Sequence, residues 1–256
     1  MPRTTFILAV IYFCVVEFVI ISYSPPAKLL LPASATISAA TPLPLVVEEK
    51  KIPDYSGEKI VYDVKMGALK IGTSTFFHQE LTKIGGIDAY LVVFTTKVAQ
   101  INDTEKIWAD TKEFLPLRVE RDVRMWPKHE NIIESYDQAL HTLDIAKQAG
   151  SKHDTQRITR QGPIHNAILL PYQVRRIEPL DPGWSMKVTL PTQEFKITLV
   201  SIEEVEVPAG KFKAFYFESS PKRFEIWISA DDRRIPIKIR GSNGLNYMMA
   251  MRSYSK

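Results

Sequence analysis

The sequence predicts a mainly β protein, built as an antiparallel curled sheet or an open barrel-like β domain with one short helical insert. Apolar and polar residues alternate with a period of two along roughly a dozen short segments. Turns containing glycine or proline separate most of these segments, and only one stretch shows helical spacing. Curling or closing the sheet would protect its exposed edges.

The amino-terminal residues carry an export pattern. Phe6–Ser22 is a nearly unbroken apolar run behind Arg3, as in a secretory signal or a single membrane-anchoring helix. Glu17 lies inside the run, and a carboxylate at the bilayer centre costs about 2.5–3.5 kcal/mol, which favours cleavage over anchoring. Because Arg3 is the only basic residue before Lys28, the body should cross the membrane. We expect residues 1–24 to be a signal peptide or an inner-membrane anchor, and the body to be periplasmic or otherwise extracytoplasmic.

Residues 25–53 are rich in Pro, Ala, Ser and Thr without sustained periodicity, which is typical of a flexible tether. We expect one β-rich domain over residues 54–256. Its sequence contains no cysteine, because Cys14 lies in the apolar run, so a disulfide, a thiolate nucleophile and a cysteine-bound metal are excluded there. The net charge is +4 with interleaved signs, so nucleic acid is not an expected partner.

The first half of the domain shows a clear hairpin. Lys59–Met66 alternates, Gly67 and Ala68 turn the chain, and alternation resumes over residues 69–77. Leu117–Met125 alternates apolar with charged residues, which indicates a half-buried strand with one charged face. Further strands are expected at Tyr90–Val98, Asn131–Tyr136 and His141–Ala146.

The middle of the chain differs. Gly150–Gln161 is polar, which predicts a loop. Pro163–Ile177 has apolar residues at helical spacing, but Pro171 interrupts them, so we expect one short or kinked helix. Asp181-Pro182-Gly183 is a strong turn signal.

Strands resume in the last third of the sequence. Pro208-Ala209-Gly210 marks a turn within this region. The expected strands are Met186–Leu190, Phe195–Val200, Glu203–Val207, Lys211–Glu218, Phe224–Ser229, Ile235–Arg240 and Asn246–Ser253.

The stretch Glu225–Arg240, EIWISADDRRIPIKIR, places Asp231-Asp232-Arg233-Arg234 between two alternating runs. The charges predict a hairpin corner with an ion pair, because aspartate at a turn accepts backbone hydrogen bonds and arginine pairs with carboxylates. A pair of arginines that grips a ligand is the alternative. Pro236 has no backbone N–H to donate to a neighbouring strand, which indicates an edge strand or the start of a strand.

Three segments resemble one bacterial exported family, the domain of unknown function 3108. Gly57–Phe76 is similar to the family's opening pattern in Gly57-Glu58, Tyr62, Gly67 and Leu69-Lys70-Ile71-Gly72. Glu225–Arg240 resembles its closing pattern, and Val207–Phe212 resembles a turn between them. The resemblance covers roughly residues 55–254. It implies an exported, β-rich envelope protein and brings no agreed activity or catalytic residues.

No assembled catalytic or cofactor motif stands out in the sequence. The last four histidines are spaced by twelve residues, which does not bring ligands together on one strand or one helix turn. Glu203-Glu204 and Asp231-Asp232 are adjacent, and neighbours on a strand face opposite sides. Neither a nucleophile elbow around a serine nor a phosphate-binding glycine loop is present. We therefore expect no cofactor and no metal.

Aromatic side chains are frequent on the expected strands, and most should form the core. One face could also line a groove for an apolar ligand. The candidate ligand-binding residues are Tyr62, Phe77, Trp227, Arg233 and Arg234.

The leading hypothesis is a non-enzymatic β scaffold of the cell envelope that binds a lipid-like, glycolipid or protein component. The alternative is a hydrolase or transferase that acts on envelope polysaccharide through two carboxylates from different strands. A third hypothesis is a purely structural module with a flat exposed patch. Membrane contact is expected through residues 6–22 if they are not cleaved.

Overall fold

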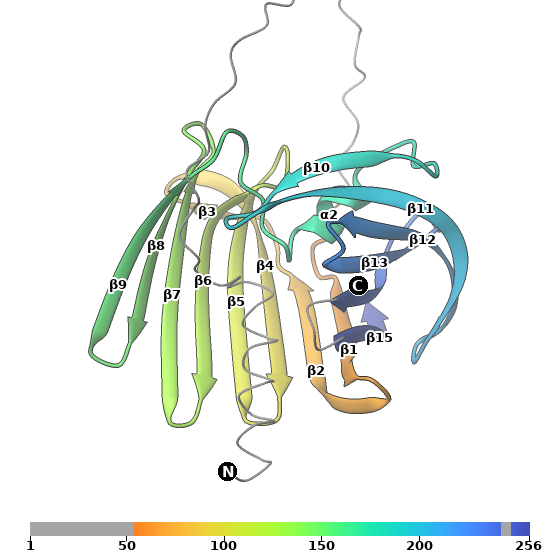
Figure 1. Cartoon of the computed structure of the whole chain (residues 1–256), viewed down its shortest axis with the longest axis horizontal. Coiled ribbons are helices and arrows are strands. Elements are labelled where there is room, and N and C mark those ends of the chain that lie inside the picture. Colours follow the sequence, from red (N-terminus) through yellow and green to blue (C-terminus); the bar gives the residue numbers. More distant parts are fainter. Residues whose placement is uncertain (1–53, 242–246) are drawn as a thin grey trace, which may run out of the picture.

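The protein is built around one continuous antiparallel sheet. The structure, a computed structural model, describes residues 54–241 and 247–256. Fifteen strands form the sheet, which curls without closing, as Figure 1 shows, so the predicted fold class is confirmed. The expected signal or anchor at residues 1–24, the tether at residues 25–53 and Cys14 lie outside the described residues.

The strands follow the chain order closely, and nearly all are hairpin neighbours. They are β1 (Lys59–Met66), β2 (Leu69–His78), β3 (Thr82–Ile84), β4 (Ile87–Val98), β5 (Ile101–Asp110), β6 (Pro116–Met125), β7 (Lys128–Asp137), β8 (Thr142–Ala149), β9 (Lys152–Thr159), β10 (Ser185–Thr189), β11 (Glu194–Val207), β12 (Gly210–Ser220), β13 (Phe224–Ser229), β14 (Pro236–Gly241) and β15 (Tyr247–Ser255). The sheet runs in the order β10-β11-β12-β13-β14-β15-β1-β2-β4-β5-β6-β7-β8-β9, and β3 pairs with β4 beside this path.

One pairing joins the two ends of the described chain. β1 pairs with β15 along its whole length, from Lys59 opposite Ser255 to Met66 opposite Tyr247. The first and the last strand therefore meet near the middle of the sheet. β4–β9 extend from this centre as a long arm, and β10–β13 bend over as a curl (Figure 1). The two ends of the sheet, β9 and β10, remain unpaired with each other.

The core fills the concave face of the sheet because strand residues alternate between faces. Ile60, Tyr62 and Phe76 point to that face and are at most 1% exposed. The described part of the chain contains one helix, α2 (Leu170–Arg175), which lies inside the curl (Figure 1) with all six residues buried. No helix of the described residues has the length and apolarity needed to cross a membrane.

The short helix is confirmed, but the expected effect of Pro171 is wrong. Pro171 occupies the first turn of α2, where its missing N–H has no intrahelical partner to lose, so it starts the helix instead of interrupting it. The carbonyl oxygen of Leu169 accepts the backbone N–H groups of Tyr172 and Gln173. The apolar spacing over residues 163–177 therefore continues beyond the helix into the buried segment before it.

Three further expectations about strands are corrected. The predicted loop at residues 150–161 contains β9, an edge strand whose residues are exposed or half-buried on both faces and so show no apolar period. The sequence does not predict β5, because Asp103 and Glu105 stand at inward positions where apolar residues would mark a strand. The two strands expected between Phe195 and Val207 are one strand, β11, with a register shift between Leu199 and Ser201.

Gly72→Ala is expected to destabilise the pairing of β2 with β4. A Cβ at Gly72 would lie 2.1 Å from the carbonyl oxygen of Lys97 and 2.9 Å from the Cα of Val98. Both are backbone atoms, so the strands must separate, and we expect a loss of about 1–3 kcal/mol in the free energy of unfolding. Gly162→Ala is the control, because no heavy atom lies within 4 Å of the added Cβ. Chemical unfolding followed by circular dichroism compares them, and equal midpoints would contradict this register.

Candidate functional site

An apolar groove lies inside the curl, next to α2. Four phenylalanine rings line it, Phe76 from β2, Phe94 from β4, Phe195 from β11 and Phe224 from β13, together with aliphatic side chains from α2, β14 and β15. About 570 Å³ of space, part of it open to solvent, lies between these side chains, but the cavity volume is only about 30 Å³. The groove is therefore a largely filled apolar site.

The alternation of β13 builds one wall of the groove. Phe224 and Ile226 line it, while Glu225 and Trp227 face the other side of the sheet. The rings meet across strands: Phe195 and Phe224 pack edge to face, with 5.4 Å between their centroids. Paired aromatic rings from separate strands give the groove walls that are large and apolar.

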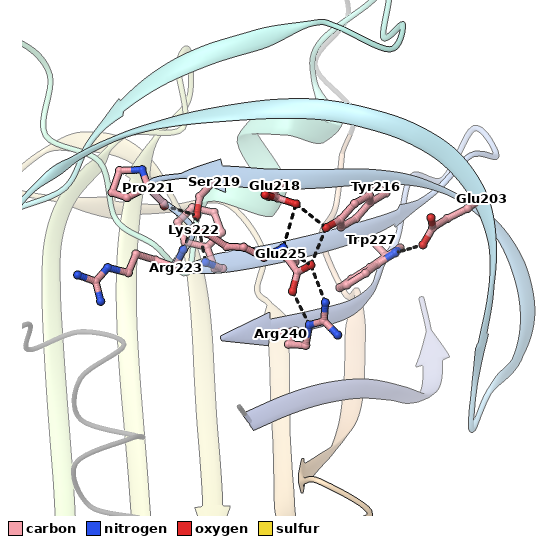
Figure 2. A network of polar contacts seen from close by, with 11 residues as sticks. Glu203, Tyr216, Glu218, Ser219, Pro221, Lys222, Arg223, Glu225, Trp227 and Arg240 are labelled. Carbon is pink, nitrogen blue, oxygen red and sulfur yellow. Dashed lines mark hydrogen bonds and ion pairs between the residues drawn. The ribbon is translucent and has the colours of Figure 1, made fainter. Parts of the chain in front are cut away.

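Arg223 is the one charged residue in the groove lining. It stands in the turn before β13, where the Ser219 hydroxyl accepts the backbone N–H groups of Arg223 at 2.9 Å and Phe224 at 3.0 Å. In Figure 2 its side chain points away from the neighbouring polar network. The Arg223 guanidinium makes no hydrogen bond or ion pair with any other residue that the structure describes, so an exposed cation borders an apolar groove.

A buried ion pair fixes α2 above the groove. Arg175 donates to both carboxylate oxygens of Glu58, at 2.6 and 2.7 Å, and both side chains are at most 2% exposed. Arg175 also donates to the carbonyl oxygen of Arg233 at 2.9 Å, and its guanidinium carbon lies 4.1 Å from the ring centroid of Tyr55. Because a buried charge is costly without partners, this cluster holds the helix in one position.

Two of the predicted ligand-binding residues take part in the same structural cluster. The Tyr62 hydroxyl donates to the carbonyl oxygen of Pro236 at 2.5 Å, and Tyr62 is fully buried. Arg234 donates to the carbonyl oxygens of Arg175 and Ile177 at the end of α2. The opening and closing segments of the family resemblance therefore meet around α2.

The other three predicted residues lie elsewhere. Phe77 is half-buried on the opposite face of β2 from Phe76. Trp227 also lies on the face away from the groove, where its indole N–H donates to Glu203 at 2.6 Å and its ring stacks on Tyr216 with 4.8 Å between centroids. Arg233 is exposed and pairs with Asp231 at 2.6 Å, which confirms a hairpin corner with an ion pair. The five residues thus do not form one site, and ligand binding by them stays a prediction.

Figure 2 shows the polar network on the face of the curl away from the groove. Arg240 donates to both oxygens of Glu225, and the Tyr216 hydroxyl shares its one proton between Glu225, 2.5 Å away, and Glu218, 2.9 Å away. Burial acts to raise the pKa of Glu225, but the hydrogen bonds from Arg240 and Tyr216 outweigh it and lower the pKa to about 2. The network ties β12, β13 and β14 together on the side of the sheet away from the groove.

A second polar cluster lies on the concave face of the arm. Arg121 donates to both oxygens of Asp103, at 2.9 and 2.5 Å, and its Nε lies 3.5 Å from Glu105. Burial, reinforced by the neighbouring carboxylates, raises the pKa of Glu105 to about 8. Burial also raises the pKa of Glu134, which accepts a hydrogen bond from Tyr136 at 2.5 Å. All three carboxyl groups are buried, so a polysaccharide would reach them only after the structure opens, and enzymatic cleavage there stays a prediction.

Sequence reasoning missed Arg223 and the carboxyl cluster. The available signal for the edge of the groove was Arg223, directly before the alternating apolar residues Phe224 and Ile226. Asp103 and Glu105 at every second position were the available signal for a polar interior on β5. Nothing local in the sequence showed that β2, β4, β11 and β13 would share one groove.

Comparison with known proteins places the chain in a family but gives it no activity. No curated protein matches the chain. A beta-barrel-like protein of domain of unknown function DUF1849 from Brucella abortus aligns with a TM-score of 0.48 and 9% identity, over 77% of this chain and 96% of that one. A candidate exported protein with a YmcC-like fold from Bacteroides fragilis aligns with a TM-score of 0.30 and 10% identity, over 80% of this chain and 98% of that one.

The family comparison covers most of the sheet. The family described as "Protein of unknown function (DUF3108)" matches residues 61–251. This range runs from β1 to β15 and includes α2, the groove and the arm. The chain therefore belongs to the DUF3108 family, as its two end segments predict.

Proposed function

We propose that this protein is a non-enzymatic binding protein for an acidic, lipid-like amphiphile of the cell envelope. The apolar part of the ligand occupies the groove inside the curl, and its anionic group pairs with Arg223. The observation that carries the proposal is one exposed arginine, Arg223, in the lining of a groove that aromatic and aliphatic side chains otherwise line. Ligand sites commonly combine an apolar pocket with a few polar groups that orient the ligand.

The chemistry of the groove selects against other small ligands. A sugar would leave its hydroxyl groups without partners between Phe76, Phe94 and Phe195, which costs free energy for each unpaired group. An acyl chain has no such groups and gains about 25 cal/mol for each Å² of apolar surface that it buries. Arg223 then supplies a charge-assisted hydrogen bond to a phosphate or carboxylate at the mouth.

Binding requires the groove to widen. The cavity volume of about 30 Å³ is far below the roughly 300–1,000 Å³ of ordinary ligand sites. The side chains that fill the groove must therefore move when the ligand enters. Phe94 and Ala167 are only partly buried, so we expect these two side chains to be among those that move.

The proposed location is outside the cytoplasmic membrane. It is supported by the apolar run Phe6–Ser22 behind Arg3. In that compartment the protein would contact amphiphiles that leave or enter a bilayer.

Native mass spectrometry of the full chain, purified in mild detergent from the envelope of the cells that produce it, tests the proposal. We expect the wild-type chain to carry an acidic lipid. Ala167→Phe fills the groove and is expected to lose the bound mass, whereas Ala139→Phe makes the same change at an exposed turn between β7 and β8 and is expected to keep it. Arg223→Gln is expected to retain lipid but to lose the preference for acidic headgroups, and Arg157→Gln on β9 is its control.

Two outcomes would refute this function. One is a wild-type chain that carries no small molecule after such a purification. The other is an Ala167→Phe chain, folded by circular dichroism, that carries the same lipid in the same amount as the wild type.

A further inference from the structure

Four hairpin turns gather at one edge of the sheet, and we call them the basic edge. They are residues 65–70 between β1 and β2, 97–102 between β4 and β5, 124–129 between β6 and β7, and 147–152 between β8 and β9. The strand registers place them side by side: Gly72 lies opposite Val98, Ile101 opposite Met125, and Glu130 opposite Ala149. Figure 1 shows the four turns together at the lower end of the strands.

The charge of this edge has one sign. Its turns contain no Asp or Glu and seven basic residues, namely Lys65, Lys70, Lys97, Arg124, Lys128, Lys147 and Lys152. Lys70, Arg124 and Lys147 pair with Asp63, Asp122 and Glu130, which lie just inside the strands. Lys65, Lys97 and Lys152 form no ion pair within the described residues, so the edge keeps a net positive charge.

The opposite edge of the same strands has the opposite sign. Its connections, residues 79–88, 110–115 and 137–141, contain five acidic residues and two lysines. Positive charge therefore gathers at one edge of these strands and negative charge at the other. An edge whose turns carry only basic charge, with three lysines that form no ion pair within the described residues, is suited to an extended anionic surface.

The basic edge also carries an interfacial aromatic residue. Trp126 in the β6–β7 turn is 86% exposed, and Leu69 in the β1–β2 turn is 66% exposed. Exposed leucine alone does not distinguish the edges, because Leu140 at the acidic edge is 68% exposed. Tryptophan, however, is enriched where a protein meets the boundary between headgroups and acyl chains, and lysine beside it attracts anionic lipids.

We propose that the basic edge docks the protein on the surface of a bilayer that contains anionic lipids, with Trp126 and Leu69 entering the headgroup region. The eight strands from β1 to β9 that reach this edge span about 34 Å at roughly 4.8 Å per strand, wide enough for several lipids to be contacted at once. Docking through folded turns is separate from any contact by residues 6–22 and does not depend on the groove.

Quenching of Trp126 by brominated lipids tests the proposal with the full chain. Vesicles contain brominated phosphatidylcholine, either alone or with about one-third phosphatidylglycerol, and the difference between the wild type and Trp126→Phe isolates the signal of Trp126. We expect quenching of Trp126 on the anionic vesicles only, and its loss in high salt, because the Debye length falls to about 3 Å at 1 M salt. Since only this residue is followed, anchoring by the amino-terminal segment does not produce the signal.

Matched charge variants complete the test. Lys65→Gln/Lys97→Gln/Lys152→Gln is expected to lower the ratio of docked to undocked protein by at least about tenfold, since each lysine near an anionic surface contributes severalfold. Lys112→Gln/Lys196→Gln/Lys213→Gln removes the same charge away from the edge and is expected to leave the ratio unchanged. Equal quenching on both kinds of vesicle, no quenching on either, or an equal loss in the control variant would overturn the proposal.

Discussion

Glu58→Ala is expected to lower the free energy of unfolding by about 3–5 kcal/mol, because it leaves the guanidinium of Arg175 buried without its carboxylate. Arg175 is enclosed by Tyr55 and Tyr172, whose rings offer only weak compensation. The loss should also loosen α2, since Arg175 connects the helix to Glu58, just before β1, and to the β13–β14 turn. Chemical unfolding followed by circular dichroism measures the change.

The exposed pair of Arg157 with Asp144 provides the control. Arg157 also donates to both carboxylate oxygens, at 2.6 Å each, but the two side chains are 69% and 50% exposed. Asp144→Ala is therefore expected to change the free energy of unfolding by at most about 1 kcal/mol. Equal losses in the free energy of unfolding for Glu58→Ala and Asp144→Ala would contradict the prediction that burial makes the Arg175–Glu58 pair costly to break.

The wild type is expected to lose stability as the pH rises from about 4.5 to about 8, and Glu105→Gln is expected to remove much of this loss. The pKa of Glu105 rises from 4.5 to about 8 in the folded protein, chiefly through burial. Over this interval the folded chain holds a proton that the unfolded chain has released, so this group makes folding less favourable as the pH rises, by about 1.4 kcal/mol for each pH unit. Glutamine keeps the neutral form at every pH, so the variant should exceed the wild type most clearly at pH 9.

The groups that face Glu105 set the size of this effect. Asp103 and Glu134 raise its pKa and Arg121 lowers it, and Glu134 has a raised pKa of its own. The variant should therefore keep a smaller dependence on pH. Free energies of unfolding at pH 5, 7 and 9 give the comparison, with Glu120→Gln, a partly exposed residue of β6, as the control. If the free energies of unfolding of Glu105→Gln and of the wild type changed equally with pH, the proton would not be held at Glu105.

Several of the strands that the sequence predicts have one dry and one wet face. In β1 and β6 the pattern of burial follows the alternation of residues, so the period of two was visible. β9 has solvent on both faces because it is the edge, and its composition resembles that of a loop. The alternation of apolar and polar residues is not visible in β5, because Asp103 and Glu105 occupy inward positions. Arg121, on the next strand, contacts both carboxylates.

The candidate site was only partly predictable, for a different physical reason. The sequence indicated an apolar groove from the abundance of aromatic residues on strands, and a groove with phenylalanine walls is present. It did not indicate which aromatic residues would line it, because one step along a strand moves a side chain to the other face of the sheet. Trp227 and Ile226 are neighbours in the sequence, and only Ile226 lines the groove. Arg223 reaches the groove lining from the turn before β13, where the Ser219 hydroxyl accepts its backbone N–H.

The pairing of β1 with β15 has a consequence for the order in which the sheet can assemble. The hairpins of the arm and the curl join residues that are close in the sequence, whereas Lys59 and Ser255 come from opposite ends of the described chain, so we expect the hairpins to form before the two parts are joined. Deletion of β15 would remove both ladders that join the arm to the curl, because β15 pairs with β1 on one side and with β14 on the other.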